Sequence, residues 1–381
     1  MNPWSVVAMT GLALLSGVRQ EGPLHVHSVN ELVARPSGAL VAFKADDSLG
    51  VLNVKEGRTV AWTDPPKAGY DLPIAWFSDG RHLLFLREGP FTPMNYFIVD
   101  AETGEVKPLD IQGVYIVPRH FYLAVLTGSN GMIFVGAKDE KGSQPGVYLA
   151  RNTGAGWRAE PVLIWEGSER RLISILWAKR EGEGFRMIAE EKGVGSDDSW
   201  TDCAICAIDV EHGKVTRRLA ITPFRPDMGM GYSEVSTDGR WLAIRRMESG
   251  PAPSQVLLFD TASRAGAPQT LNLDVHWFRM SPSGKALLLW DSKPARLAVV
   301  DTASLRRRAL PVPENVGFVQ DAAWLSDDEV AVSLPSGGAH IWVLNVETGQ
   351  ARSVWRTSRE AKSQGKQASV VSLTLLYIWR S

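Results

Sequence analysis

The sequence predicts an all-β protein, a seven-bladed β-propeller whose blades are four-stranded antiparallel sheets. Three observations predict it. A unit of short apolar strands and tight turns recurs seven times, its apolar runs are rich in β-branched and aromatic residues, and no segment shows a helical period. A four-strand repeat with a period of about 41 to 59 residues is typical of propeller blades around a central channel.

Each repeat begins with an apolar strand that ends in a tight polar turn. In most units the turn pairs Gly with Ser, Asp or Asn, which indicates a hairpin because Gly accepts the positive φ of a two-residue turn. The seven turns lie at residues 35–38, 77–80, 128–131, 180–184, 236–239, 281–284 and 325–328. The strands predicted to follow them lie at residues 40–43, 83–86, 132–135, 186–189, 242–245, 286–290 and 330–333.

A third strand, a second turn rich in Thr, Ser and Gly, and a fourth strand complete each unit. Tryptophans recur at equivalent places in these units. First strands carry Trp76, Trp177 and Trp324, and fourth strands carry Trp62, Trp165 and Trp355. We interpret them as aromatic packing between blades and not as a sugar-binding surface.

Residues 75–109 contain AWFSDGRHLLFLREG and YFIVDAETGEVKPL, which resemble the repeat of the TolB-type propellers. The strings VSTDGRWLAIRR, RMSPSGKALLLW and AWLSDDEVAVS repeat the pattern, and the resemblance runs from about residue 29 to 357, with poorer matches in the third and fourth units. It implies a propeller but no particular activity, because turn and core positions make up the motif. TolB carries an α/β domain ahead of its propeller, for which this chain has no room, so we expect a stand-alone propeller and not TolB itself.

The composition and the N-terminal residues bear on location. With 41 Lys and Arg against 42 Asp and Glu, no global charge attracts nucleic acid, and we expect no nucleic-acid partner. Residues 4–17 are uncharged and mostly apolar, a length that suits a secretory signal and is too short to span a bilayer. No Lys or Arg precedes this run and no clear cleavage motif follows it. We expect residues 1–20 to be a signal peptide and the protein to be periplasmic or secreted; the alternative is a buried N-terminal segment in a cytoplasmic protein.

Residues 21–381 are predicted to form one propeller domain, monomeric and without an integral membrane segment. A propeller ring must close where its ends meet, because an unpaired strand edge is a liability. Residues 369–379 are β-branched and aromatic and are expected to add a strand to a terminal blade. Residues 23–29 compete with them for that place.

The sequence identifies no catalytic residue, no metal site and no cofactor. Cys203 and Cys206 lie in one strand and point to opposite faces, too far apart for a disulfide. Among the seven histidines, His25 and His27 have a same-face spacing and His276 opens a first strand, but no third ligand is identifiable. Residues 196–202 lack the Gly and Glu of a calcium loop, and residues 231–235, GYSEV, lack the last Gly of a nucleophile motif.

Long connections are predicted to gather at one end of the propeller, where binding sites usually reside. They comprise residues 63–73, 87–95, 138–146, 191–202, 222–232 and 247–255. The candidate binding residues in them are Tyr70, Phe91, Trp200 and Arg225. We expect a non-catalytic, exported binding or scaffold protein that recognises a protein or peptide partner on this face. The alternative is a polysaccharide lyase or hydrolase at the mouth of the channel, since the oligogalacturonate lyases are similar seven-bladed propellers that use a metal and a base there.

Overall fold

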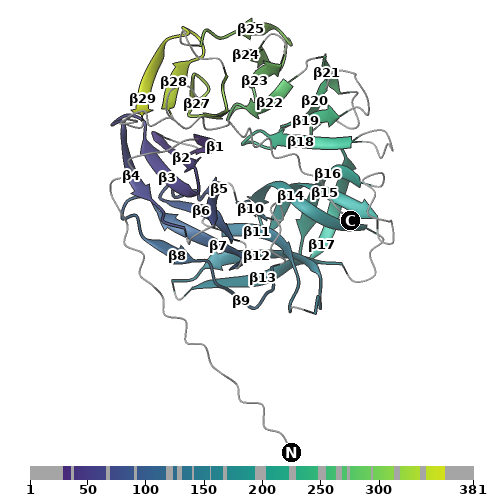
Figure 1. Cartoon of the computed structure of the whole chain (residues 1–381). Coiled ribbons are helices and arrows are strands. Elements are labelled where there is room, and N and C mark those ends of the chain that lie inside the picture. Colours follow the sequence, from purple (N-terminus) through teal and green to yellow (C-terminus); the bar gives the residue numbers. More distant parts are fainter. Residues whose placement is uncertain are drawn as a thin grey trace, which may run out of the picture.

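A computed structural model describes the chain from residue 29 to residue 356. The segments outside the description are residues 36–37, 66–68, 90–91, 117–122, 127–130, 140, 155, 166–169, 194–202, 223–228, 248–254, 263–267, 273–274, 293–294, 313–317 and 335–339. Within the described residues all regular elements are strands, arranged as seven sheets around a ring (Figure 1). The prediction of an all-β, seven-bladed propeller with four antiparallel strands per blade is confirmed.

The first two strands of each blade form its inner half. The innermost strands are β1 (Val29–Ala34), β5 (Tyr70–Trp76), β10 (Leu123–Val125), β14 (Arg170–Glu181), β18 (Gly229–Val235), β22 (Val275–Met280) and β26 (Asp321–Trp324). The second strands are β2 (Leu40–Ala45), β6 (His82–Gly89), β11 (Gly131–Gly136), β15 (Gly184–Gly193), β19 (Trp241–Met247), β23 (Ala286–Ser292) and β27 (Glu329–Leu334). Each pair is antiparallel, so the first turn of every blade lies at the same end of the ring.

The third and fourth strands form the outer half of each blade. The third strands are β3 (Ser48–Asn53), β7 (Thr92–Asp100), β12 (Gly146–Asn152), β16 (Cys203–Glu211), β20 (Gln255–Asp260), β24 (Ala295–Asp301) and β28 (His340–Asn345). The fourth strands are β4 (Arg58–Trp62), β8 (Val106–Pro108), β13 (Trp157–Ile164), β17 (Lys214–Ala220), β21 (Gln269–Asn272), β25 (Arg307–Ala309) and β29 (Ala351–Arg356). The third blade has a fifth strand, β9 (Ile111–Gln112), which pairs in parallel with β13.

The seven innermost strands are neighbours in ring order and line the central channel (Figure 1). In five blades the ladder between the first and second strand shifts register, at β1, β5, β14, β18 and β22. Such bulges redirect side chains, so the alternation of an ideal strand does not decide which residues of these strands face the channel.

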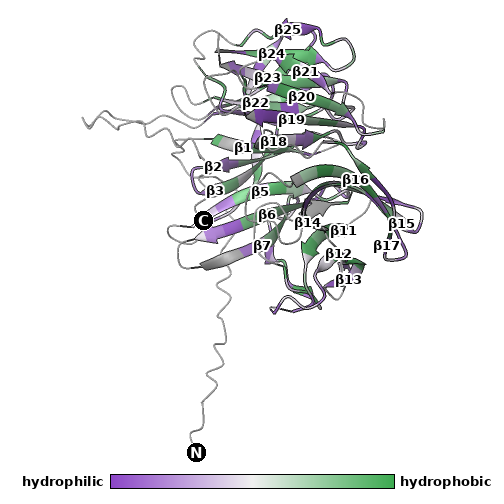
Figure 2. Cartoon of the chain, turned by 90° about the vertical axis from the view of Figure 1, so that its right-hand side faces the viewer, coloured by the Kyte–Doolittle hydropathy of each residue, from purple (hydrophilic) through white to green (hydrophobic). Residues whose placement is uncertain are grey.

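Apolar surface is buried mainly between neighbouring blades. In Figure 2 hydrophobic residues follow the strands, and hydrophilic residues gather at strand ends. Trp76, Trp177 and Trp324 lie in innermost strands, and each donates its indole N–H to a backbone carbonyl of a neighbouring blade at 2.9 to 3.0 Å. The interpretation of these tryptophans as packing between blades agrees with these contacts, which add a directional bond to the burial.

The ring closes between blades that are each built from consecutive strands. The Leu32 amide of β1 donates to the Asp321 carboxylate of β26 at 2.8 Å, and Arg352 of β29 donates to the Val54 carbonyl at 2.8 Å. One apolar cluster contains residues of both the first and the last blade, including Phe43 and Ile341. The predicted closing strands at residues 369–379 and 23–29, apart from Val29, lie outside the described residues, as does the predicted signal peptide at 1–20.

A search of the described residues for a helix long and apolar enough to cross a membrane finds none.

Candidate functional site

Charged side chains from four blades gather along one side of the channel wall. They are Glu31 on β1, Glu234 on β18, Arg279 on β22 and Asp321 on β26, here called the acid cluster. All four belong to innermost strands, and these four strands are consecutive in the ring. Charged groups in otherwise apolar strands are costly unless they are paired, so their arrangement needs an explanation.

Arg279 is the centre of the acid cluster. Its Nη2 donates to Asp321 Oδ1 at 2.6 Å, and its Nη1 donates to Glu234 Oε1 at 3.2 Å. Its Nε donates to the Ala322 carbonyl at 3.0 Å, which fixes the plane of the guanidinium. One guanidinium therefore holds two carboxyl groups in the same part of the channel wall.

The two carboxyl groups have different surroundings. The Asp321 side chain is buried and accepts hydrogen bonds from both Arg279 and the Leu32 amide. Glu234 accepts from the Met280 amide at 2.6 Å, but its contact with Arg279 is the longer one. Burial, and to a smaller extent the Asp321 charge, raises the pKa of Glu234 to about 8, although the Met280 amide opposes the rise. Glu234 is therefore protonated at neutral pH and able to donate a proton.

Glu31 has the most accessible carboxyl group of the acid cluster. The residue is exposed to solvent, yet desolvation by the surrounding wall, followed by the Asp321 charge, raises its pKa, while Arg279 and Lys44 oppose the rise. Its φ is 50°, in the left-handed region that a Glu rarely adopts, and it lies within the bulge of β1. Strained residues of this kind, costing about 1–3 kcal/mol, are concentrated at functional sites.

The arrangement can move protons. A protonated Glu234 supplies an acid, and the exposed Glu31 carboxylate supplies a base at the same wall. Two titratable groups whose environments differ in this way are the pattern of acid–base catalysis.

Of the four predicted binding residues, only Tyr70 lies within the described part of the chain. Its hydroxyl donates to Glu88 Oε2 at 2.5 Å, and the Lys44 ammonium lies 4.6 Å from the centre of its ring. Lys44 interacts electrostatically with Glu31, so Tyr70 is near the acid cluster on the side of the first two blades. Phe91, Trp200 and Arg225 lie outside the described residues, and their role in binding stays a prediction.

The histidines and cysteines of the described segments do not converge on a metal site. Within those segments no group of three or more His, Cys, Asp or Glu side chains has the geometry to hold a metal ion. His276 lies in β22 as expected, where it is exposed, whereas His212 lies in the hairpin between β16 and β17 beside Glu183. Cys206 is a buried thiol that donates to Glu191 Oε2 at 3.3 Å, and His25, His27 and residues 196–202 lie outside the described part.

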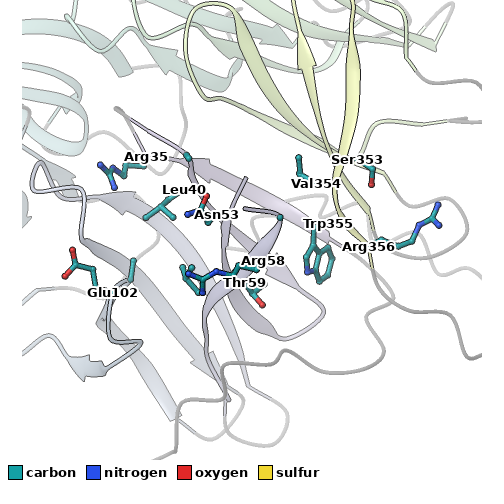
Figure 3. A pocket seen from close by; sticks show the side chains of 14 residues that line it. Arg35, Leu40, Asn53, Arg58, Thr59, Glu102, Ser353, Val354, Trp355 and Arg356 are labelled. Carbon is teal, nitrogen blue, oxygen red and sulfur yellow. The ribbon is translucent and has the colours of Figure 1, made fainter. Parts of the chain in front are cut away.

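A second candidate is a groove of about 1040 Å³ between the outer strands β4 and β29, at the end where the tight turns lie (Figure 3). Arg58, Thr59 and Trp355 lie on its two sides (Figure 3). Among the described residues that line it, Glu102 is the only carboxylate, and Arg81 pairs with it at 3.1 Å. The groove therefore lacks the paired acid and base that the channel wall provides.

The sequence interpretation overlooked the acid cluster. Its members lie in four separate repeats, Glu234 and Arg279 two residues before the first turn and Glu31 and Asp321 four residues before it. The other three repeats do not carry the set, so the repeat pattern alone does not identify it. One signal was available: VNELVA, GMGYSEV, VHWFRM and DAAW each place a charged residue inside an apolar innermost strand.

No protein-family model matches the chain, and no curated protein matches it. Solved structures do match it. A prolyl endopeptidase structure has a TM-score of 0.56 and 16% identity over 86% of this chain and 48% of the endopeptidase. A puromycin-hydrolysing peptidase of Mycobacterium tuberculosis has a TM-score of 0.51 and 12% identity over 90% of this chain and 58% of the peptidase. The chain thus spans about half the length of these peptidases.

Oligogalacturonate lyase from Vibrio parahaemolyticus matches along nearly its whole length. The TM-score is 0.53 and the identity 12%, over 86% of this chain and 93% of the lyase. TolB from Acinetobacter baumannii is also among the matched structures, at a TM-score of 0.43. At these identities the likeness concerns the fold.

The comparisons correct one expectation. The chain was expected to be a non-catalytic binding or scaffold protein that recognises a protein or peptide, but the matched propellers include peptidases and lyases. They contradict the expectation of a non-catalytic scaffold, and the alternative, a polysaccharide lyase or hydrolase at the channel mouth, stays a proposal. The physical reason for the error is that repeat residues report turns and cores, whereas the acid cluster depends on contacts between blades.

Proposed function

We propose that the protein cleaves glycosidic bonds of a polysaccharide at the propeller channel, as a hydrolase or a lyase. The acid cluster carries the proposal: Arg279 joins Glu234, whose pKa is about 8, to Asp321 in the channel wall. The likeness to a lyase over 93% of that enzyme's length supports it, because the propeller there accounts for nearly the whole enzyme.

Glu234 is the proton donor in this proposal. Cleavage on either route breaks the bond between a sugar carbon and the bridging oxygen, and that oxygen must receive a proton as it leaves. Glu234 holds a proton at neutral pH and keeps part of its side chain, 19%, open to solvent. Arg279 and the Met280 amide fix the orientation of its carboxyl group.

Glu31 is the base, because Asp321 is buried and already occupied by Arg279 and the Leu32 amide. In hydrolysis Glu31 takes a proton from the water that attacks the sugar carbon. In elimination it takes a proton from the sugar ring, and a carbon–carbon double bond forms as the oxygen leaves. On both routes Glu31 accepts one proton and Glu234 donates one proton to the leaving oxygen, so each route balances.

The test is a screen of the full chain against neutral and acidic polysaccharides. Hydrolysis produces new reducing ends only, whereas elimination also produces an unsaturated sugar that absorbs in the ultraviolet. We expect one of these product patterns, and we expect Glu234→Gln and Glu31→Gln each to lower the rate by about 10²–10⁴-fold.

Glu190→Gln is the matched control. Burial also raises the pKa of Glu190, which accepts a hydrogen bond from Ser174 in the fourth blade, and this blade contributes no member of the acid cluster. It should keep the wild-type rate. Equal activity of Glu234→Gln and wild type, or no cleavage of any polysaccharide by the wild type, contradicts the proposal.

We further propose that the repeats are of the TolB type and that the chain is exported. The turn and strand motifs of residues 75–109 support the first proposal, and the uncharged run at residues 4–17 supports the second. Expression with the N-terminal segment intact should yield a protein whose mass lacks about twenty residues. A full-length mass in the cytoplasm contradicts export.

A further inference from the structure

Phe318 is a large apolar side chain that stays exposed on the surface of the propeller. Among the described residues the large apolar side chains that stay exposed are Val215, at 45%, and Phe318, at 40%. Val215 lies on the outer strand β17, whereas Phe318 lies in the segment that leads into the innermost strand β26. The exposed part of the Phe318 ring is therefore open to a ligand close to the start of β26.

Two aromatic neighbours fix the Phe318 ring. It packs edge-to-face against the buried Trp290 at 5.6 Å and against His276 at 6.1 Å, with interplanar angles of 85° and 83°. Arg245 Nη1 donates to the His276 carbonyl at 3.0 Å and ties that residue to the next blade. A ring held on two sides loses little freedom when a ligand packs on it.

Phe318 and His276 have the same sequence offset from two members of the acid cluster. Phe318 precedes Asp321 by three residues, and His276 precedes Arg279 by three residues on the neighbouring innermost strand. Three residues of extended chain span about 10 Å. Along the chain, Phe318 and His276 therefore lie at most about 10 Å from Asp321 and Arg279, toward the end where the innermost strands begin.

The chemistry of the pair suits a sugar. A pyranose ring presents C–H groups on its faces and hydroxyl groups at its edge. An aromatic face packs against the C–H groups, and an exposed imidazole exchanges hydrogen bonds with hydroxyls.

We propose that Phe318 and His276 form a subsite that holds one sugar ring of the polysaccharide within about 10 Å of the acid cluster. This rests on the proposed function and adds to it a binding position separate from the reacting bond. The subsite binds the chain before cleavage and sets which bond reaches Glu234.

The test measures binding without cleavage. The full chain carrying Glu234→Gln is titrated by calorimetry with hexamers of 1,4-linked glucose, xylose and galacturonate. We expect at least one hexamer to bind, with Phe318→Ala weakening it by about tenfold and Phe318→Trp restoring it to within about twofold. Val215→Ala, the other exposed apolar side chain, should leave the affinity unchanged.

His276→Ala keeps the Phe318–Trp290 contact and serves as the second variant should Phe318→Ala fail to fold. We expect it to lower the affinity for the same hexamer. The subsite is refuted if none of the three hexamers binds. It is also refuted if the Phe318 and His276 variants bind as tightly as the protein that carries Glu234→Gln alone. Cleavage is measured separately, in proteins that keep Glu234. If Phe318→Ala and His276→Ala cleave at the wild-type rate, the subsite alone is refuted. If the hexamers bind but the wild type cleaves none of them, the proposed function alone is refuted.

Discussion

Glu234→Gln should change how the stability of the propeller depends on pH. The native protein keeps the Glu234 proton up to about pH 8, whereas the unfolded chain releases it near the ordinary value of 4.5. Between these values the native state binds one proton more than the unfolded state, so this residue makes stability fall as pH rises from about 4.5 to 8. Gln resembles the protonated form at every pH, and the substitution removes this dependence.

The magnitude follows from the pKa difference. At 1.36 kcal/mol for each pKa unit, the free energy of unfolding of the wild type relative to Glu234→Gln should fall by on the order of 5 kcal/mol between pH 4 and pH 9. Urea unfolding followed by tryptophan fluorescence at several pH values measures both proteins. Other groups titrate in both, so the difference between the two curves isolates Glu234. A difference that is constant with pH refutes the assignment of Glu234 as a protonated acid.

Three further substitutions test contacts between and within blades. Arg279→Met leaves Asp321 buried without its cation and should cost about 3–5 kcal/mol in urea unfolding; a loss below 1 kcal/mol contradicts the central place of Arg279. Trp324→Phe removes the indole bond to the Arg279 carbonyl and should cost about 1–2 kcal/mol, which an unchanged denaturation midpoint would exclude. Asp71→Asn removes the charge and one of the two acceptors that a fully buried carboxylate offers Arg87 and should cost about 3 kcal/mol, compared with no loss for the exposed Glu183→Gln.

The fold was predictable from the sequence because its determinants are local. Gly80 and Gly239 have φ of 63° and 75°, as the turn motifs require, and the apolar runs that follow both turns are second strands. Trp76 and Trp324 recur at the same place in the unit because each bonds to a neighbouring blade. Local pattern and tertiary contact agree at these positions.

The acid cluster was not predictable in the same way. Which innermost residues meet depends on the bulges of β1, β18 and β22, and a bulge leaves no clear trace in a single strand's sequence. The left-handed conformation of Glu31 is imposed by its surroundings, since a Glu has no preference for it. A charge inside an apolar strand indicates a partner in another blade without identifying it.

The pH dependence of polysaccharide cleavage tests the central claim most directly. With the polysaccharide that the screen identifies, kcat/KM of the wild type should fall as pH rises through about 8, where Glu234 loses its proton. Glu31→Gln should lower kcat/KM by at least about a hundredfold at pH 7 while binding of the substrate persists. A wild-type rate that is flat from pH 6 to pH 10, or that Glu31→Gln and Glu234→Gln leave unchanged, contradicts a catalytic site at the acid cluster.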